Sequence, residues 1–142
     1  MTADLLAEIR EDFLALEQKD RLLLLLEFAN ELPELPQEFQ DHPDLLERVV
    51  ECQSPVFIFV DVDADGFFHL HATAPRESPT TRGFASILAQ GLDGLSVEQV
   101  LAVPDDYPQS IGLSEAVSPL RLRGMSAMLG RAKRQLRERV AA

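Results

Sequence analysis

The chain has only one cysteine, Cys52, among its 142 residues. A single thiol excludes any internal disulfide and is typical of a protein kept in a reducing compartment. Long apolar runs are also missing, because the longest, Leu22 to Leu26, falls far short of the roughly 20 residues that span a bilayer. The first residues, MTADLLAEIREDF, mix acids with apolar residues and lack the pattern of a signal peptide. We therefore expect a cytoplasmic protein with no membrane partner.

Basic residues are scarce: 13 Lys and Arg stand against 24 Asp and Glu, which gives a net charge of −11. Residues 1–65 hold 17 of the acids and 4 of the bases. A nucleic acid would repel such a chain, so we expect no nucleic-acid partner. The bases gather in residues 121–139, which form either a solvated helix face suited to the helix dipole or a surface that docks on an acidic protein.

Several motifs of common chemistry are absent or incomplete. Neither a glycine-rich phosphate loop nor a G-x-S-x-G elbow is present. Asp61–Gly66 reads like the start of a calcium loop, but Ala72 stands where the loop needs a glutamate, so a hairpin turn is the better interpretation. His69 and His71 share a strand face and would need Cys52 and a fourth ligand to hold zinc. We expect no metal site.

At this length we expect one domain over residues 1–142, which can bury a stable core without a disulfide or a metal ion. Hydrophobic spacing predicts helices over residues 3–18, 19–36, 80–91, 96–103 and 118–140. Residues 55–62 and 67–73 read as strands joined by an Asp-Gly hairpin, with room for a third strand. The expected fold class is α+β, with a small antiparallel sheet built on this hairpin and packed against several helices.

Three details of the helices follow from the same pattern. Asp20 is a candidate N-cap of the second helix, whose wide apolar face predicts deep burial. Ser118 is the candidate N-cap of the last helix, with proline at its first position. The buried stripe of that helix is expected to run from Met125 to Val140.

Cys52 is either an inert, buried side chain or a reactive thiol. Free cysteines are often buried and inert. However, this one precedes a strand in a polar stretch with Gln53, Ser54 and Pro55, and such loops often carry reactive groups. Glu51 would oppose ionisation of the thiol, as would Glu47, whereas Arg48 or any arginine brought near by the fold would favour it.

The segment RVVECQSPVFI, Arg48 to Ile58, resembles the sequence around the active cysteine of the SufE family, the sulfur acceptors of cysteine desulfurases. Further similar segments follow in the family's order: ANELPELP, Arg82-Gly83, GLSVEQV and LSEAVSPLRLRGMSAML. The resemblance covers about residues 15–137. Glu51 stands where the family has glycine and Phe57 where it often has tryptophan, and the loop APRESPTT is about two residues longer than usual.

This resemblance implies a SufE/IscU-like fold and the role of a sulfur carrier. Cys52 matches the cysteine that accepts sulfur as a persulfide from a pyridoxal-phosphate desulfurase (SufS-like), which it stimulates. Arg121 matches the arginine of the family's S-P-x-R motif, and Glu77 falls where the family often has aspartate. Gln53 and Ser54 complete the motif around the cysteine. No cofactor of its own is implied, since the pyridoxal phosphate belongs to the desulfurase.

The recipients implied are iron–sulfur scaffold proteins, so the chain would be a sulfurtransferase-type partner rather than an independent enzyme. Two alternatives remain. The chain could be an acidic adaptor with an inert cysteine, or the same sulfur chemistry could serve another sulfur-transfer pathway.

Overall fold

A computed structural model describes residues 3–141, and its α+β class agrees with the sequence prediction. The helices are α1 (Ala3–Leu14), α2 (Gln18–Asn30), α3 (Gln37–Asp41), α4 (Pro79–Gly91), α5 (Val97–Leu101), α6 (Tyr107–Ser110) and α7 (Pro119–Ala141). The strands are β1 (Glu47–Arg48), β2 (Phe57–Val62) and β3 (Phe68–Thr73). Short 3-10 turns are η1 (Pro43–Leu45), η2 (Val50–Cys52) and η3 (Leu113–Glu115).

The sheet is a three-stranded antiparallel sheet in the order β1-β2-β3. The predicted hairpin forms its centre, with Val62 opposite Phe68 and Phe57 opposite Thr73. Its turn contains Gly66 at φ +87°, a left-handed conformation that glycine adopts without strain. The short strand β1 is the third strand of the sheet, and it leads directly into the turn η2, which carries Cys52.

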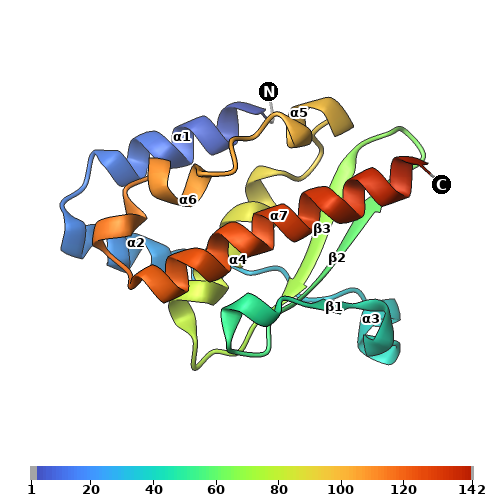
Figure 1. The fold of residues 1–142 in the computed structure, drawn as a ribbon, viewed down its shortest axis with the longest axis horizontal. Coiled ribbons are helices and arrows are strands. Elements are labelled where there is room, and N and C mark those ends of the chain that lie inside the picture. The colour runs from blue at the N-terminus through green and yellow to red at the C-terminus, as the bar shows by residue number, and fades with distance from the viewer. Residues whose placement is uncertain (1–2, 142) are drawn as a thin grey trace.

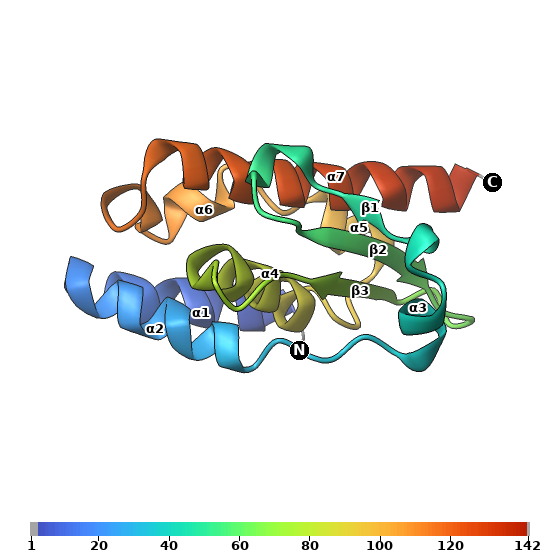
Figure 2. The same cartoon turned by 90° about the horizontal axis from the view of Figure 1, so that it is seen from below.

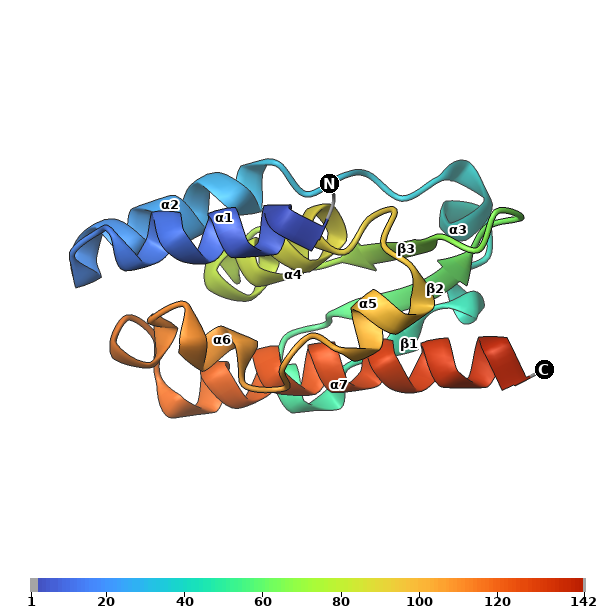
Figure 3. The same cartoon turned by 90° about the horizontal axis from the view of Figure 1, so that it is seen from above.

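The elements form tiers around the hairpin. Helix α7 runs along β2 on one side, and α4 packs against β3 (Figures 1 and 2). Helices α1 and α2 cover α4 on the side away from α7, as the view from above shows (Figure 3). The teal and green segment of β1 and η2 lies against α7 (Figure 2). Two parts of the chain distant in sequence thus meet beside Cys52.

The core lies between these tiers and is filled by apolar side chains from every tier. Its largest fully buried members include Phe13, Phe68, Phe84, Leu25, Ile58, Ile87, Leu88, Ile111 and Met125. Gly83 allows α4 to approach α2, because a Cβ at this position would lie 2.2 Å from the carbonyl oxygen of Leu25. Arg82 donates from Nε to the carbonyl of Ala29 at the end of α2, at 2.8 Å. The Arg-Gly pair therefore serves the packing of α2 on α4.

The helix predictions hold in outline and fail in three details. Helix α2 begins after Glu17, so Asp20 lies within its first turn and is not the N-cap. Its apolar face is deeply buried only in part: Leu25 and Ala29 are buried, whereas Leu23 is 58% exposed, because α2 packs on α4 and α1 and leaves its outer side to solvent. Val140 is 51% exposed because it lies in the last turn of α7, at the end of that helix.

The predicted N-cap of α7 is present. The Ser118 hydroxyl accepts the backbone N–H of Arg121 at 3.3 Å, with Pro119 opening α7. Ser96 and Gln99 form a capping box at the start of α5. Among residues 3–141, no helix combines the length and apolar character needed to cross a membrane.

Candidate functional site

Cys52 ends the turn η2, between two strands rather than within the core. Its flanks are fixed, because Val49 and Val56 are fully buried and the Val49 N–H donates to the Val56 carbonyl at 2.8 Å. The chain between them reverses at Gln53, which has φ +57°. A left-handed φ at a residue other than glycine is uncommon and often marks a functional turn. The cysteine therefore sits at the tip of a short excursion held at its two ends.

The thiol rests against the backbone of α7. Its Sγ lies 3.5 Å from the carbonyl oxygen of Gly124, to which it donates a long hydrogen bond. Gly124 allows this approach, since a Cβ there would lie 3.1 Å from both the Cα and the Sγ of Cys52. The cysteine is half-buried as a result.

A polar hollow opens beside the thiol, with a volume of about 360 Å³. Its lining consists of Cys52, Gln53, Ser54, Ser78, Thr81, Ser118, Leu120 and Arg121. These residues come from three places in the sequence: the cysteine turn, the start of α4 and the start of α7. Hydroxyl groups and one guanidinium group suit a small polar or anionic group held next to the sulfur.

The resting thiol is protonated. Burial, and then the neighbouring Glu51 carboxylate, raise the pKa of Cys52 to about 11, while Arg131 acts in the opposite direction. At neutral pH only about one molecule in 10⁴ then carries the thiolate, which is the nucleophilic form. The turn must change its surroundings before the sulfur reacts quickly.

An ion-pair network links the cysteine turn to α7. The Arg131 guanidinium donates to both Glu51 carboxylate oxygens, from Nε at 2.9 Å and from Nη2 at 3.2 Å. Arg131 also donates to Glu47 in β1, which accepts further hydrogen bonds from Arg134 and Gln135. These hydrogen bonds hold the pKa values of both glutamates below the ordinary value, against their partial burial.

The predicted site residues differ in how close they come to the sulfur. Gln53 and Ser54 line the hollow with Cys52, and the Ser54 hydroxyl donates to the Cys52 carbonyl at 3.2 Å. Arg121 lines the same hollow, where its Nη1 donates to the Thr80 hydroxyl at 3.1 Å. Glu77 is exposed in the loop before α4 and does not line the hollow, although its neighbour Ser78 does.

The two histidines of β3 have other neighbours. His69 lies between Asp63, at 2.8 Å from Nε2, and Asp93, at 2.6 Å from Nδ1, and these carboxylates raise its pKa. His71 packs against Phe39, and burial lowers its pKa. Within residues 3–141, no group of three or more His, Cys, Asp and Glu side chains is placed to hold a metal ion.

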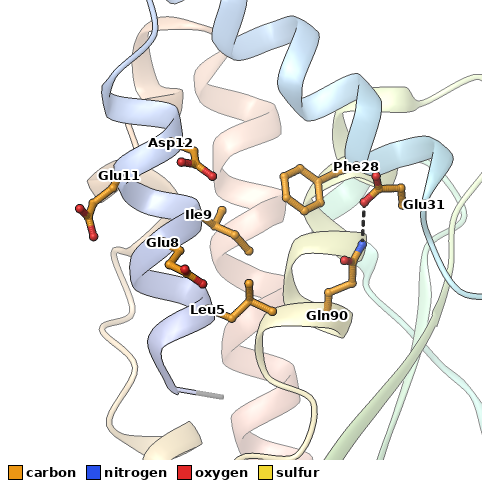
Figure 4. Close-up of a pocket in the computed structure, with 8 residues that line it drawn as sticks. All are labelled: Leu5, Glu8, Ile9, Glu11, Asp12, Phe28, Glu31 and Gln90. Carbon is orange, nitrogen blue, oxygen red and sulfur yellow. Dashed lines mark hydrogen bonds between the residues drawn. The ribbon is translucent and has the colours of Figure 1, made fainter. Parts of the chain in front are cut away.

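A second hollow, of about 380 Å³, lies between α1, α2 and α4 (Figure 4). Glu8, Glu11 and Asp12 project from α1, while Gln90 on α4 donates to Glu31 at the end of α2. Leu5, Ile9 and Phe28 form the rest of its lining. This hollow holds acids and an amide but no nucleophile, so the candidate reactive site is the one at Cys52.

Comparison with known proteins identifies the family of the chain. Residues 7–136 match the SufE family, described as an Fe-S metabolism associated domain. An uncharacterized SufE-like protein of Mycobacterium tuberculosis is 55% identical over 133 residues, which cover 94% of this chain and 92% of that protein. A chloroplastic/mitochondrial SufE-like protein 1 of Arabidopsis thaliana is 28% identical over 80% of this chain, but the match spans only 29% of the plant protein.

The fold has a solved counterpart. The solution structure of a hypothetical protein from Thermus thermophilus superposes with a TM-score of 0.84 and 39% identity, covering 98% of each chain. The chain belongs to the SufE family, and its domain is of the kind associated with iron–sulfur metabolism.

Sequence reasoning missed two residues next to the thiol, Gly124 and Arg131. Arg131 was visible only as one of several bases in the last helix, and Gly124 only as part of a motif. Neither lies near Cys52 in the sequence, and contact between them depends on how α7 packs beside η2. A spacing of seven residues, two turns of helix, is the one local signal that they share a face.

Proposed function

We propose that this chain is a sulfur carrier for a cysteine desulfurase. The Cys52 thiolate attacks the outer sulfur of a persulfide on the desulfurase. The sulfur–sulfur bond of that persulfide breaks, a new sulfur–sulfur bond forms on Cys52, and the desulfurase cysteine leaves as a thiolate. No electrons are gained or lost overall, because one persulfide replaces another.

The observation that carries the proposal is the position of the only cysteine. It lies at the tip of a turn, half-buried, at the mouth of a polar hollow, and it coincides with the cysteine of the family's C-Q-S motif. An inert structural cysteine would need neither the reversed backbone at Gln53 nor a hollow beside it. A single thiol also protects the bound sulfur, since a second thiolate could attack the inner sulfur of the persulfide, form a disulfide with Cys52 and release the outer sulfur as sulfide.

The lining of the hollow suits the product. A persulfide is acidic and carries negative charge at neutral pH, so it gains from hydrogen-bond donors and a nearby cation. The hydroxyls of Ser78, Thr81 and Ser118 line this hollow and can donate to such an anion, and Arg121 is the cation that lines it. Arg121 therefore stabilises the persulfide anion after the carrier leaves the desulfurase. The sulfur then passes to a scaffold protein that builds iron–sulfur clusters.

The chain contributes the thiol and its surroundings. The desulfurase contributes the pyridoxal phosphate and releases sulfur from free cysteine. The high pKa of the resting thiol keeps it inactive in the free protein. Docking on the desulfurase must therefore expose the turn. Glu77 is exposed on the loop before α4 and does not line the hollow, so we expect it to contact the desulfurase rather than the sulfur.

Cys52→Ser separates this function from that of an acidic adaptor. The variant should bind the desulfurase with unchanged affinity but no longer increase its turnover of cysteine, measured as alanine released. Unchanged stimulation by Cys52→Ser would remove the carrier role and leave an adaptor. Sulfur accepted on Cys52 but delivered to a product other than a cluster would keep the chemistry and change the pathway.

A further inference from the structure

The turn that carries Cys52 is held on α7 at two points. One is the contact of Cys52 with the backbone of Gly124, and the other is the forked hydrogen bond from Arg131 to Glu51. Gly124 and Arg131 are seven residues apart and therefore lie on one face of the helix. The side of η2 that faces α7 is thus fixed by an ion pair and by a contact with a residue that has no side chain.

The rest of the turn has few apolar anchors. Val49 and Val56 are fully buried and mark its fixed ends, whereas Val50 between them is 62% exposed. Gln53 and Pro55 are exposed as well. The segment 50–55 can therefore move as a flap hinged at the two buried valines, with the ion pair as its principal side-chain tie to α7.

We propose that the Glu51–Arg131 pair is a latch that holds the cysteine flap against α7 in the resting protein, and that Arg131 is a positioning residue for Cys52. The inference rests on the proposed function, since a latch matters only when the thiol has to leave its resting place. Glu47 anchors the arginine from the other side, because it accepts a hydrogen bond from the same guanidinium. The latch is therefore attached both to the moving flap and to the fixed strand β1.

The two halves of the latch act on the thiol with opposite sign. Glu51 disfavours the thiolate and Arg131 favours it, while Arg121 is the other charged group in the hollow. Glu51→Gln opens the latch and removes the carboxylate, so it should lower the pKa of Cys52. Arg131→Gln also opens the latch and relieves the burial of the thiol, but it leaves the carboxylate in place without its partner, so it should lower that pKa less than Glu51→Gln does. A general loss of structure would not separate the variants in this way.

The test compares Glu51→Gln and Arg131→Gln with Arg137→Gln, which removes an exposed arginine of the same helix. Backbone hydrogen exchange at Cys52, whose N–H donates to the Val49 carbonyl, reports opening of the flap without any chemistry. We expect exchange there to rise at least about threefold in both latch variants and to stay unchanged in Arg137→Gln. The N–H of Phe84 in α4 should keep its protection in all three, which separates local opening from unfolding.

Alkylation of Cys52 by iodoacetamide, followed against pH, supplies the second measurement. The midpoint of the alkylation profile should fall further in Glu51→Gln than in Arg131→Gln, and the plateau rate at high pH should rise in both. Unchanged exchange and plateau in both latch variants would overturn the latch. Neither measurement needs a desulfurase, so the latch and the sulfur-carrier function can fail separately.

Discussion

Gly124 lies directly against Cys52, close enough that a Cβ on the glycine would be 3.1 Å from both the Cα and the Sγ of the cysteine. The S-P-x-R-x-x-G segment of α7 thus provides the surface on which the thiol rests. The helix and the cysteine turn are 72 residues apart in the chain, and the glycine is what lets their backbones touch.

Gly124→Ala should push the cysteine turn outward. Alanine favours a helix over glycine by about 1 kcal/mol, but here the new methyl group must displace Cys52 by a few tenths of an ångström. Gly130→Ala is the matched control, because nothing lies within 4 Å of a Cβ at that position. We expect Gly130→Ala to raise the free energy of unfolding by about 1 kcal/mol and Gly124→Ala to raise it less.

The same pair of variants should differ in thiol reactivity. Alkylation of Cys52 should be faster in Gly124→Ala than in the wild type, because the sulfur loses its contact with α7, and unchanged in Gly130→Ala. Equal stabilisation by both alanines, together with unaltered alkylation, would show that the contact does not hold the turn.

Arg121→Ala should slow the transfer of sulfur to Cys52 without unfolding the protein. The guanidinium lines the hollow beside the thiol, and a hydrogen bond to a charged group contributes about 1.5–3 kcal/mol, so a decrease of roughly tenfold or more is expected. The uptake rate from a desulfurase, with thermal unfolding as the check on stability, measures this. Arg123→Ala, which removes an exposed arginine two residues along α7, should keep the normal rate. Equal rates for the two variants would remove the assigned role of Arg121.

The stabilising contribution of His69 should depend on pH. Asp93 and Asp63 raise its pKa above the ordinary 6.5, so its contribution is complete below pH 6.5 and is lost as pH rises through the raised value. The difference in unfolding free energy between the wild type and His69→Gln should therefore shrink on going from acid to alkaline conditions. Its size should be about 1 kcal/mol or less, because these side chains are partly exposed and screened.

His71 provides the opposite trend within the same strand. Burial lowers its pKa, so the folded protein binds fewer protons there than the unfolded chain, and stability falls as pH drops below 6.5. The advantage of the wild type over His71→Gln should therefore grow with rising pH. Denaturant unfolding at several pH values measures both variants, and parallel trends for the two would contradict these assignments.

The sequence predicted those features that local chemistry decides. The hairpin follows from two β-rich runs around Asp-Gly, and the start of α7 follows from Ser118 and Pro119. The predicted burial of α2 was too high, because a run of leucines shows that a helix is apolar but not how many other elements pack against it. Cys52 was found through its polar setting and the C-Q-S motif, whereas Arg131 could not be found, because its contact with Glu51 joins positions 80 residues apart.

The interpretation of Glu51 from the sequence was only partly correct. A carboxylate beside the thiol was expected to oppose ionisation, and it does contribute to the raised pKa of Cys52. Its pairing with Arg131 depends on the tertiary structure alone. The positive φ of the turn falls on Gln53 and not on Glu51, so this turn does not require glycine where the family has it.

The central claim is that Cys52 accepts a sulfur atom, and the most direct measurement is the mass of the intact protein after incubation with a cysteine desulfurase and free cysteine. The wild type should gain one sulfur, about 32 Da, located on Cys52 by peptide analysis and removable by a reductant, as expected for a persulfide. Cys52→Ser should gain nothing. A wild-type protein that stays at its original mass while the desulfurase turns over, or a gain that survives in Cys52→Ser, would contradict the account.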